Sequence, residues 1–90
     1  MEYKSVLIVD DDETIVLVLK HYLKDTFEEI ITASNGKEAL DKTKTNDFSL
    51  IVTDLSMPVM DGIEFFKEFR DRSPMKFNIS VRVLKFESKI

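Results

Sequence analysis

Short apolar runs alternate along this chain with longer stretches in which apolar residues recur at helical spacing. The first run, residues 6–9, consists of β-formers, with Lys4-Ser5 before it and three acidic residues after it. A strand that is apolar on both faces is typical of the middle of a parallel sheet with helices on each side. Residues 29–33 and 48–53 are predicted to form two further strands.

Helical spacing occurs in three segments, residues 13–24, 37–43 and 62–71. Asp11 or Asp12 is the natural N-cap of the first segment, because a carboxylate there accepts from free backbone N–H groups and suits the helix dipole. Ser73-Pro74 is expected to end the third segment. Strands that alternate with helices in this way indicate βαβ units, and hence a parallel sheet with right-handed crossovers.

The segment after Pro74 has a different pattern, in which Phe77, Ile79, Val81 and Val83 alternate with polar residues. This alternation predicts a fourth strand with one solvent-facing side, and no fourth helix is predicted. We therefore expect a βαβαβα core over residues 1–74 and an atypical C-terminal strand or tail over residues 75–90.

The composition narrows the class of protein. A length of 90 residues allows one small domain, and 43% hydrophobic with 33% charged residues is a globular composition. The absence of cysteine excludes disulfides and thiolate sites, and a single His argues against a zinc site built from imidazoles. A net charge of −4 gives no basic footprint for nucleic acid, and no apolar run approaches the roughly 18 residues of a membrane span. With no secretory signal in the sequence, the expectation is a soluble cytoplasmic domain.

Carboxylates follow two of the predicted strands: Asp10, Asp11 and Asp12 come after the first, and Asp54 ends the third. Ligands of open α/β sheets bind beyond the carboxyl ends of the strands, so neighbouring first and third strands would bring Asp10, Asp11 and Asp54 into one cleft. Clustered carboxylates need a cation, since like charges at close range are costly. Oxygen-only ligation favours a hard ion, Mg²⁺ or Mn²⁺. Asp12 and Glu13 are expected to be ordinary acids of a first helical turn.

Three motifs, in residues 6–13, 33–40 and 47–62, occur in the order found in bacterial response-regulator receiver domains. The most specific runs Asp54-Leu55-Ser56-Met57-Pro58-Val59-Met60-Asp61-Gly62. The chain resembles that family from about residue 4 to residue 74. The resemblance implies a flavodoxin-like, doubly wound parallel sheet with the strand order 2-1-3-4-5.

The same resemblance implies the roles of particular residues. Asp54 would be the phosphoacceptor, Asp10 and Asp11 would bind Mg²⁺ or Mn²⁺ with it, and Ser56 would offer its backbone carbonyl to the metal. The phosphoryl group would come from a sensor histidine kinase, a phosphotransfer protein or a small phosphodonor, and no independent substrate turnover is expected. Gly62 is expected to supply a backbone conformation that other residues resist.

The chain departs from this family near its C-terminal end. A complete receiver has five strands, of which the fourth ends in a Thr or Ser that meets the phosphoryl group and the fifth in a Lys that pairs with it. Aligning residues 79–84 on that fourth strand puts Lys85 where the hydroxyl should be and Arg82 inside a strand expected to be apolar. The sequence therefore predicts an incomplete, altered or truncated receiver of about four strands and three helices, with a defective switch. Whether Lys85 replaces a missing group stays open.

Two other functions are compatible with the sequence. Asp10-Asp11-Asp12-Glu13-Thr14 fits the first motif of haloacid-dehalogenase-type phosphatases, with Asp10 as nucleophile and Asp12 as acid/base. The chain lacks the later acidic pair and the cap domain of that class. The second alternative is a receiver-derived module that no longer signals and serves assembly.

Self-association, most simply as a homodimer, is expected from the incomplete sheet. Without its fourth and fifth helices, the apolar first and third strands would be partly uncovered on one face, and the fourth strand would have an open edge. The strand over residues 77–83, with Arg82 and Lys85 as charged punctuation, is the expected contact.

Overall fold

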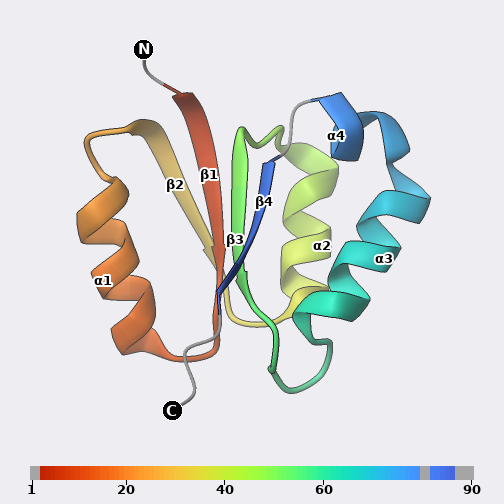
Figure 1. Cartoon of the computed structure of the whole chain (residues 1–90), viewed down its shortest axis with the longest axis horizontal. Helices are drawn as coiled ribbons and strands as arrows, with labels where there is room; N and C mark the ends of the chain where they lie inside the picture. Colours follow the sequence, from red (N-terminus) through yellow and green to blue (C-terminus); the bar gives the residue numbers. More distant parts are fainter. Residues whose placement is uncertain (1–2, 80–81, 87–90) are drawn as a thin grey trace.

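Four parallel strands form one sheet in the order β2-β1-β3-β4 (Figure 1). In this computed structural model, the backbone is described for residues 3–79 and 82–86. The elements are β1 (Tyr3–Val9), α1 (Glu13–Leu23), β2 (Phe27–Ala33), α2 (Gly36–Thr45), β3 (Leu50–Asp54), α3 (Gly62–Arg72), α4 (Pro74–Ile79) and β4 (Arg82–Phe86). The sheet reverses its order at β1, where the chain steps outward to β2 and then back to β3. The predicted doubly wound α/β class is confirmed, and the strand order follows the expected 2-1-3-4 sequence as far as it goes.

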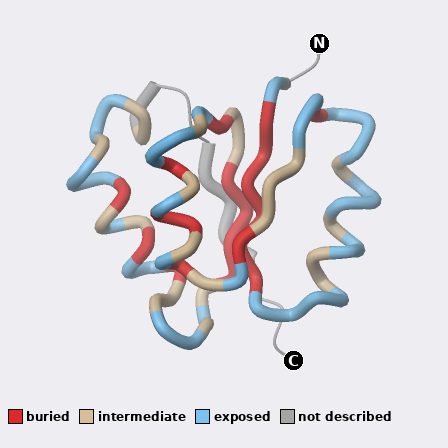
Figure 2. The backbone as a smooth tube through the Cα atoms, turned by 180° about the vertical axis from the view of Figure 1, so that it is seen from behind, coloured by how far each residue is buried: buried red, intermediate tan, exposed pale blue. Residues whose placement is uncertain are grey.

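The helices cover the two faces of the sheet unequally. α1 lies on one face, and α2, α3 and α4 lie on the other (Figure 1). Figure 2 shows that burial concentrates along the central strands and on the inward sides of α2 and α3. β1 is buried on both sides, because Leu7 and Val9 belong to the core under α2 and α3 while Val6 and Ile8 belong to the core under α1.

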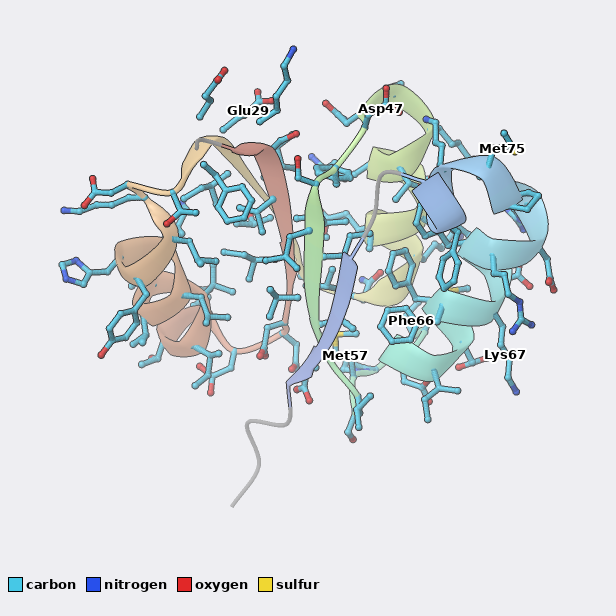
Figure 3. The ribbon with its side chains drawn as sticks, turned by 45° about the horizontal axis from the view of Figure 1, so that its top comes forward. Glu29, Asp47, Met57, Phe66, Lys67 and Met75 are labelled. Carbon is cyan, nitrogen blue, oxygen red and sulfur yellow. The ribbon has the colours of Figure 1, made fainter. Side chains whose placement is uncertain are left out.

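Aromatic side chains of α3 fill the larger core. Phe65 and Phe69 are buried, and their rings stack with centroids 5.8 Å apart. Figure 3 shows Phe66 on the inner side of α3 and Lys67 on its outer side, and Phe66 is partly buried whereas Lys67 is exposed. The phenylalanines of the stripe that predicted a helix over residues 62–71 therefore do face the sheet, whereas Ile63 is 49% exposed.

The face under α1 is better covered than the sequence suggested. Val6 and Ile8 are fully buried and Val52 is 6% exposed. The expectation that the first and third strands would be partly uncovered is therefore wrong for these side chains, against which Phe27 and the apolar residues of α1 pack. Ile30 of β2 and Leu50 of β3 remain partly exposed on this face.

The segment after α3 differs from its prediction. Ser73-Pro74 does end α3, but residues 74–79 then form α4, so the strand predicted over residues 77–83 is wrong over 77–79 and begins instead at Arg82. Proline is favoured at the first helical position, where its missing N–H is not needed, and the Phe77 N–H donates to the Ser73 carbonyl over 3.0 Å. Ser80 and Val81 lie outside the described residues.

Contacts with the core and with α2 hold α4 in place. The ring of Phe77 meets Phe69 edge-on with centroids 5.7 Å apart. The Lys76 ammonium donates to the Thr43 carbonyl near the end of α2 over 2.8 Å and lies 3.4 Å from an Asp47 carboxylate oxygen. The described part of the chain thus has four helices where three were predicted. Within that part, none of the helices is long and apolar enough to cross a membrane.

Candidate functional site

Three carboxylates meet at the carboxyl edge of the sheet. Asp10 follows β1 directly and Asp54 is the last residue of β3, and these strands pair in parallel with Val9 opposite Thr53. One carboxylate oxygen from each of Asp10, Asp11 and Asp54 lies within 4.8 Å of the other two. The structure therefore brings together the three acids that the sequence singled out, at the point where the strand order reverses.

The carboxylate of Asp10 is the most constrained of the three. Asp10 is 3% exposed, and its Oδ1 accepts from the Asp12 N–H over 2.9 Å. Its Oδ2 is buried and has no hydrogen-bond partner among the described residues. Burial raises the pKa of Asp10, the Asp12 N–H opposes that effect, and the charges of Asp54, Asp11 and Asp12 raise the pKa further. A buried carboxylate oxygen without a partner is costly, and a bound cation would remove the cost.

Asp54 and Asp11 complete a donor set of oxygens. Asp54 is 1% exposed and Asp11 is exposed, so the cluster has a buried floor and a solvent-facing side. Oxygen donors of this kind fit a hard divalent cation that keeps some of its waters. The donor set thus fits Mg²⁺ or Mn²⁺.

Asp12 is used for helix capping. It is the N-cap of α1, and its Oδ1 accepts from the N–H groups of Thr14, over 2.9 Å, and Ile15, over 3.4 Å. Glu13 is the first residue of the helix. Of the two predicted caps, Asp12 is therefore the correct one, and both residues have the structural roles expected of them.

The loop after β3 starts from the candidate acceptor. The Ser56 N–H donates to Asp54 Oδ1 over 3.3 Å, and Met57 turns back against the core beside the end of β3 (Figure 3). The role of the Ser56 carbonyl stays a prediction. Asp61 caps α3 by accepting from the Glu64 N–H over 2.9 Å.

Gly62 is required for space rather than for an unusual backbone conformation, which corrects the expectation. Its φ is not positive, but a Cβ at this position would collide with the Asp54 carbonyl oxygen. Among the described residues, the one with a positive φ is Val59, at 72°. This backbone conformation could not be predicted from the sequence, because valine strongly disfavours that region.

A hollow of about 400 Å³ opens beside the acidic cluster, between α1 and the β2–α2 loop. Its lining includes the carboxylates of Asp10, Asp11, Glu13 and Glu38. Ser34 donates through both its N–H and its hydroxyl to Glu38 Oε1, each over 2.8 Å, and these bonds lower the pKa of Glu38. The Glu38 N–H in turn donates to Asn35 Oδ1 over 2.8 Å. Sequence analysis missed this arrangement, although Asn35 followed three residues later by Glu38 is the pattern of a capping box.

Comparison with known proteins identifies the fold and its family. The sequence model of the response regulator receiver domain matches residues 6–85. The chain is 44% identical over 72 residues to the alkaline phosphatase synthesis transcriptional regulatory protein PhoP of Bacillus subtilis, covering 80% of this chain and 30% of that protein. It is 42% identical over 67 residues to the transcriptional regulatory protein SrrA of Staphylococcus aureus, covering 74% of this chain and 28% of that protein. The chain therefore spans less than a third of the length of these curated relatives.

Solved structures show the same likeness. The chemotaxis protein CheY4 of Vibrio cholerae superposes with a TM-score of 0.83 at 35% identity, over 98% of this chain and 71% of that one. The response regulator TrrA of Thermotoga maritima, in complex with Mg²⁺-BeF, superposes with a TM-score of 0.80 at 31% identity, over 96% of this chain and 70% of that one. With its motifs, strand order and acidic cluster, this chain belongs to the response regulator receiver domain family of two-component systems.

Proposed function

We propose that Asp54 accepts a phosphoryl group in a reaction that depends on Mg²⁺ or Mn²⁺. The metal would be held by Asp10, Asp11, Asp54 and the backbone carbonyl of Ser56. The observation that carries the proposal is the convergence of three carboxylates within 4.8 Å, with the buried Asp10 Oδ2 lacking a partner among the described residues. The Mg²⁺-BeF complex of the Thermotoga maritima relative supports it.

The chemistry follows from the position of Asp54. Its carboxylate oxygen attacks phosphorus, the P–N bond of a phosphohistidine or phosphoramidate donor breaks, and the electron pair of that bond passes to the departing nitrogen. The Ser56 N–H holds the Asp54 carboxylate through Oδ1 and limits its rotation. Asp10 and Asp11 would hold the metal beside the acceptor, and a cation bound there would supply positive charge against the transferred group. The donor would be a sensor histidine kinase, a phosphotransfer protein or a small phosphodonor.

A weak response to phosphorylation is the second part of the proposal. The register pairs Lys85 with Thr53 and Phe86 with Asp54, and the sequence of β4 contains neither Ser nor Thr. A phosphoryl group on Asp54 would therefore lack a hydroxyl from β4. We therefore expect slow modification of Asp54 and a small conformational change. The side chain of Lys85 lies outside the described part of the structure.

Self-association is the third part, and it supports the alternative of a receiver-derived assembly module. β4 lies at the edge of the described sheet, with one side of its backbone unpaired there. An open strand edge is a template for pairing with a second copy of the chain. Light scattering at low micromolar concentration would show a dimer, and a monomer would remove this part alone.

The experiment for the acceptor role uses intact-mass spectrometry after incubation with phosphoramidate and Mg²⁺. The wild-type chain should gain one phosphoryl group, Asp54→Asn should gain none, and Asp11→Asn should react more slowly. Asp25→Asn is the matched control, because Asp25 is exposed in the turn after α1, away from the acidic cluster. Equal labelling of Asp54→Asn and wild type would refute the acceptor role.

The phosphatase alternative is tested in the same series. It requires turnover of a phosphomonoester that Asp10→Asn abolishes and Asp54→Asn does not. Nothing in the geometry favours it, since the Asp12 carboxylate that would act as acid/base caps α1.

A further inference from the structure

The acceptor loop, residues 55–61 between β3 and α3, is joined by a hydrogen bond to the start of α2, which is distant in sequence. The Gly36 N–H, at the first residue of α2, donates to the Met60 carbonyl over 2.8 Å. A Cβ on Gly36 would lie 2.7 Å from that carbonyl oxygen and 2.8 Å from Met60 Cγ. Both distances are shorter than a Cβ tolerates, so this approach of the two backbones requires glycine.

The fastened loop contains a strained turn. Val59 has a φ of 72°, and the Met60 N–H reaches back to the Pro58 carbonyl over 2.8 Å, which closes a three-residue turn of the γ type. The Val59 side chain is 76% exposed, so its packing does not hold the turn. The Gly36–Met60 hydrogen bond comes directly after the strained residue and restrains it from outside the loop.

The same loop also reaches the acidic cluster. At its start, the Ser56 N–H donates to Asp54 Oδ1, and at its end the Gly62 N–H meets the Leu55 carbonyl over 3.4 Å. The contact at Met60 lies between these two points. A displacement of Met60 is therefore transmitted along a short, closed stretch of backbone to the residues beside Asp54.

We infer that Gly36 is a positioning residue for the acceptor loop and that its contact with Met60 sets the affinity of the acidic cluster for Mg²⁺. Gly36 touches neither the metal nor the transferred group. It acts through Met60, which holds the loop that carries Ser56. This inference rests on the metal site of the proposed function.

The experiment compares Mg²⁺ affinities by isothermal titration calorimetry. Gly36→Ala should bind Mg²⁺ about threefold to tenfold more weakly than wild type, the loss expected when one hydrogen bond no longer holds the site. Thr43→Ala is the matched control, since Thr43 is buried at the far end of the same helix and its loss destabilises α2 without touching the loop. A merely structural role for Gly36 predicts that both variants keep the wild-type affinity well below their melting temperatures, and that result would overturn the inference.

A measurement on the unaltered chain covers the case in which Gly36→Ala does not fold. If the hydrogen bond between Gly36 and Met60 strengthens Mg²⁺ binding, then by linkage Mg²⁺ binding must strengthen that hydrogen bond equally. Saturating Mg²⁺ should therefore slow hydrogen exchange of the Gly36 amide severalfold more than that of the Ala39 amide, which is bonded to Asn35 over 3.0 Å. Equal effects on the two amides would overturn the inference alone. Absence of Mg²⁺ binding by wild type would overturn the proposed function as well.

Discussion

Replacing Asp10 with Asn should make the metal-free domain more stable. Asp10 is 3% exposed, its Oδ2 is buried without a partner among the described residues, and two other carboxylates have oxygens within 4.8 Å. An unsatisfied buried polar atom costs about 1–3 kcal/mol. One pair of charges 4.8 Å apart repels by about 3 kcal/mol at an effective dielectric constant near 20, and less where Asp11 faces solvent. Asn removes the charge and offers an N–H, so we expect a net gain of about 1–3 kcal/mol in the free energy of unfolding.

The assay is urea unfolding of wild type and Asp10→Asn, in EDTA and in saturating Mg²⁺. The variant should be the more stable protein in EDTA, and its advantage should shrink or reverse in Mg²⁺, because the cation stabilises the wild-type native state by mass action. Asp25→Asn, an exposed acid distant from the cluster, should change neither measurement by more than about 0.5 kcal/mol. A variant that is less stable than wild type in EDTA would show that the cluster is not under electrostatic strain.

Three further changes test other parts of the structure. Val59→Gly should raise the free energy of unfolding by about 0.5–1.5 kcal/mol, since glycine accepts the φ of 72° and the valine is exposed. Val18→Gly, inside α1, is the control and should lower the free energy of unfolding. A loss of stability at both positions in thermal melts would contradict the backbone strain at Val59. Glu38→Gln should lower the free energy of unfolding by about 0.5–1 kcal/mol at pH 7. Because the pKa of Glu38 is lowered in the folded state, this difference from wild type should fade as pH falls through that pKa. A stability difference that does not depend on pH in urea titrations would argue against an ionised Glu38 in this role. Lys76→Met should lower the free energy of unfolding by about 0.5–1.5 kcal/mol through loss of the hydrogen bond to the Thr43 carbonyl. Hydrogen exchange should become faster only in α4 and at the end of α2. An unchanged exchange pattern would show that α4 is held by its apolar contacts alone.

The acidic cluster could be predicted because its cause is simple. Asp10 and Asp54 come directly after apolar runs, and parallel strands put their carboxyl ends on the same edge, so adjacency of β1 and β3 suffices to bring the acids together. The pKa shift of Asp10 and its unpartnered oxygen depend on the exact depth of the site, which periodicity does not encode.

The segment after α3 could not be predicted in this way. Phe77 and Ile79 alternate with polar residues as in a strand, but Phe77 packs on Phe69 and Lys76 bonds to the end of α2, and these tertiary contacts favour a short helix. The loop after Asp54 also departs from its prediction: Gly62 was expected to have the unusual backbone conformation, whereas the positive φ falls on Val59, next to Met60, whose carbonyl accepts from the Gly36 N–H.

The exposure of α1 implies an order in which the elements of the fold unfold locally. α1 has no buried residue, and Leu17 and Tyr22 are largely exposed, whereas α2 buries three side chains and α3 buries two. Local opening is easiest where less apolar surface is lost, and α1 covers the smaller of the two cores, so α1 should detach while α2, α3 and the sheet remain folded. The first turn of α1 is joined to the acidic cluster through Asp12, whose carboxylate caps the helix and whose N–H donates to Asp10 Oδ1. The acidic site therefore lies where α1, the helix expected to open first, joins the rest of the domain. A ligand that binds the carboxylates of this site would also oppose the opening of α1.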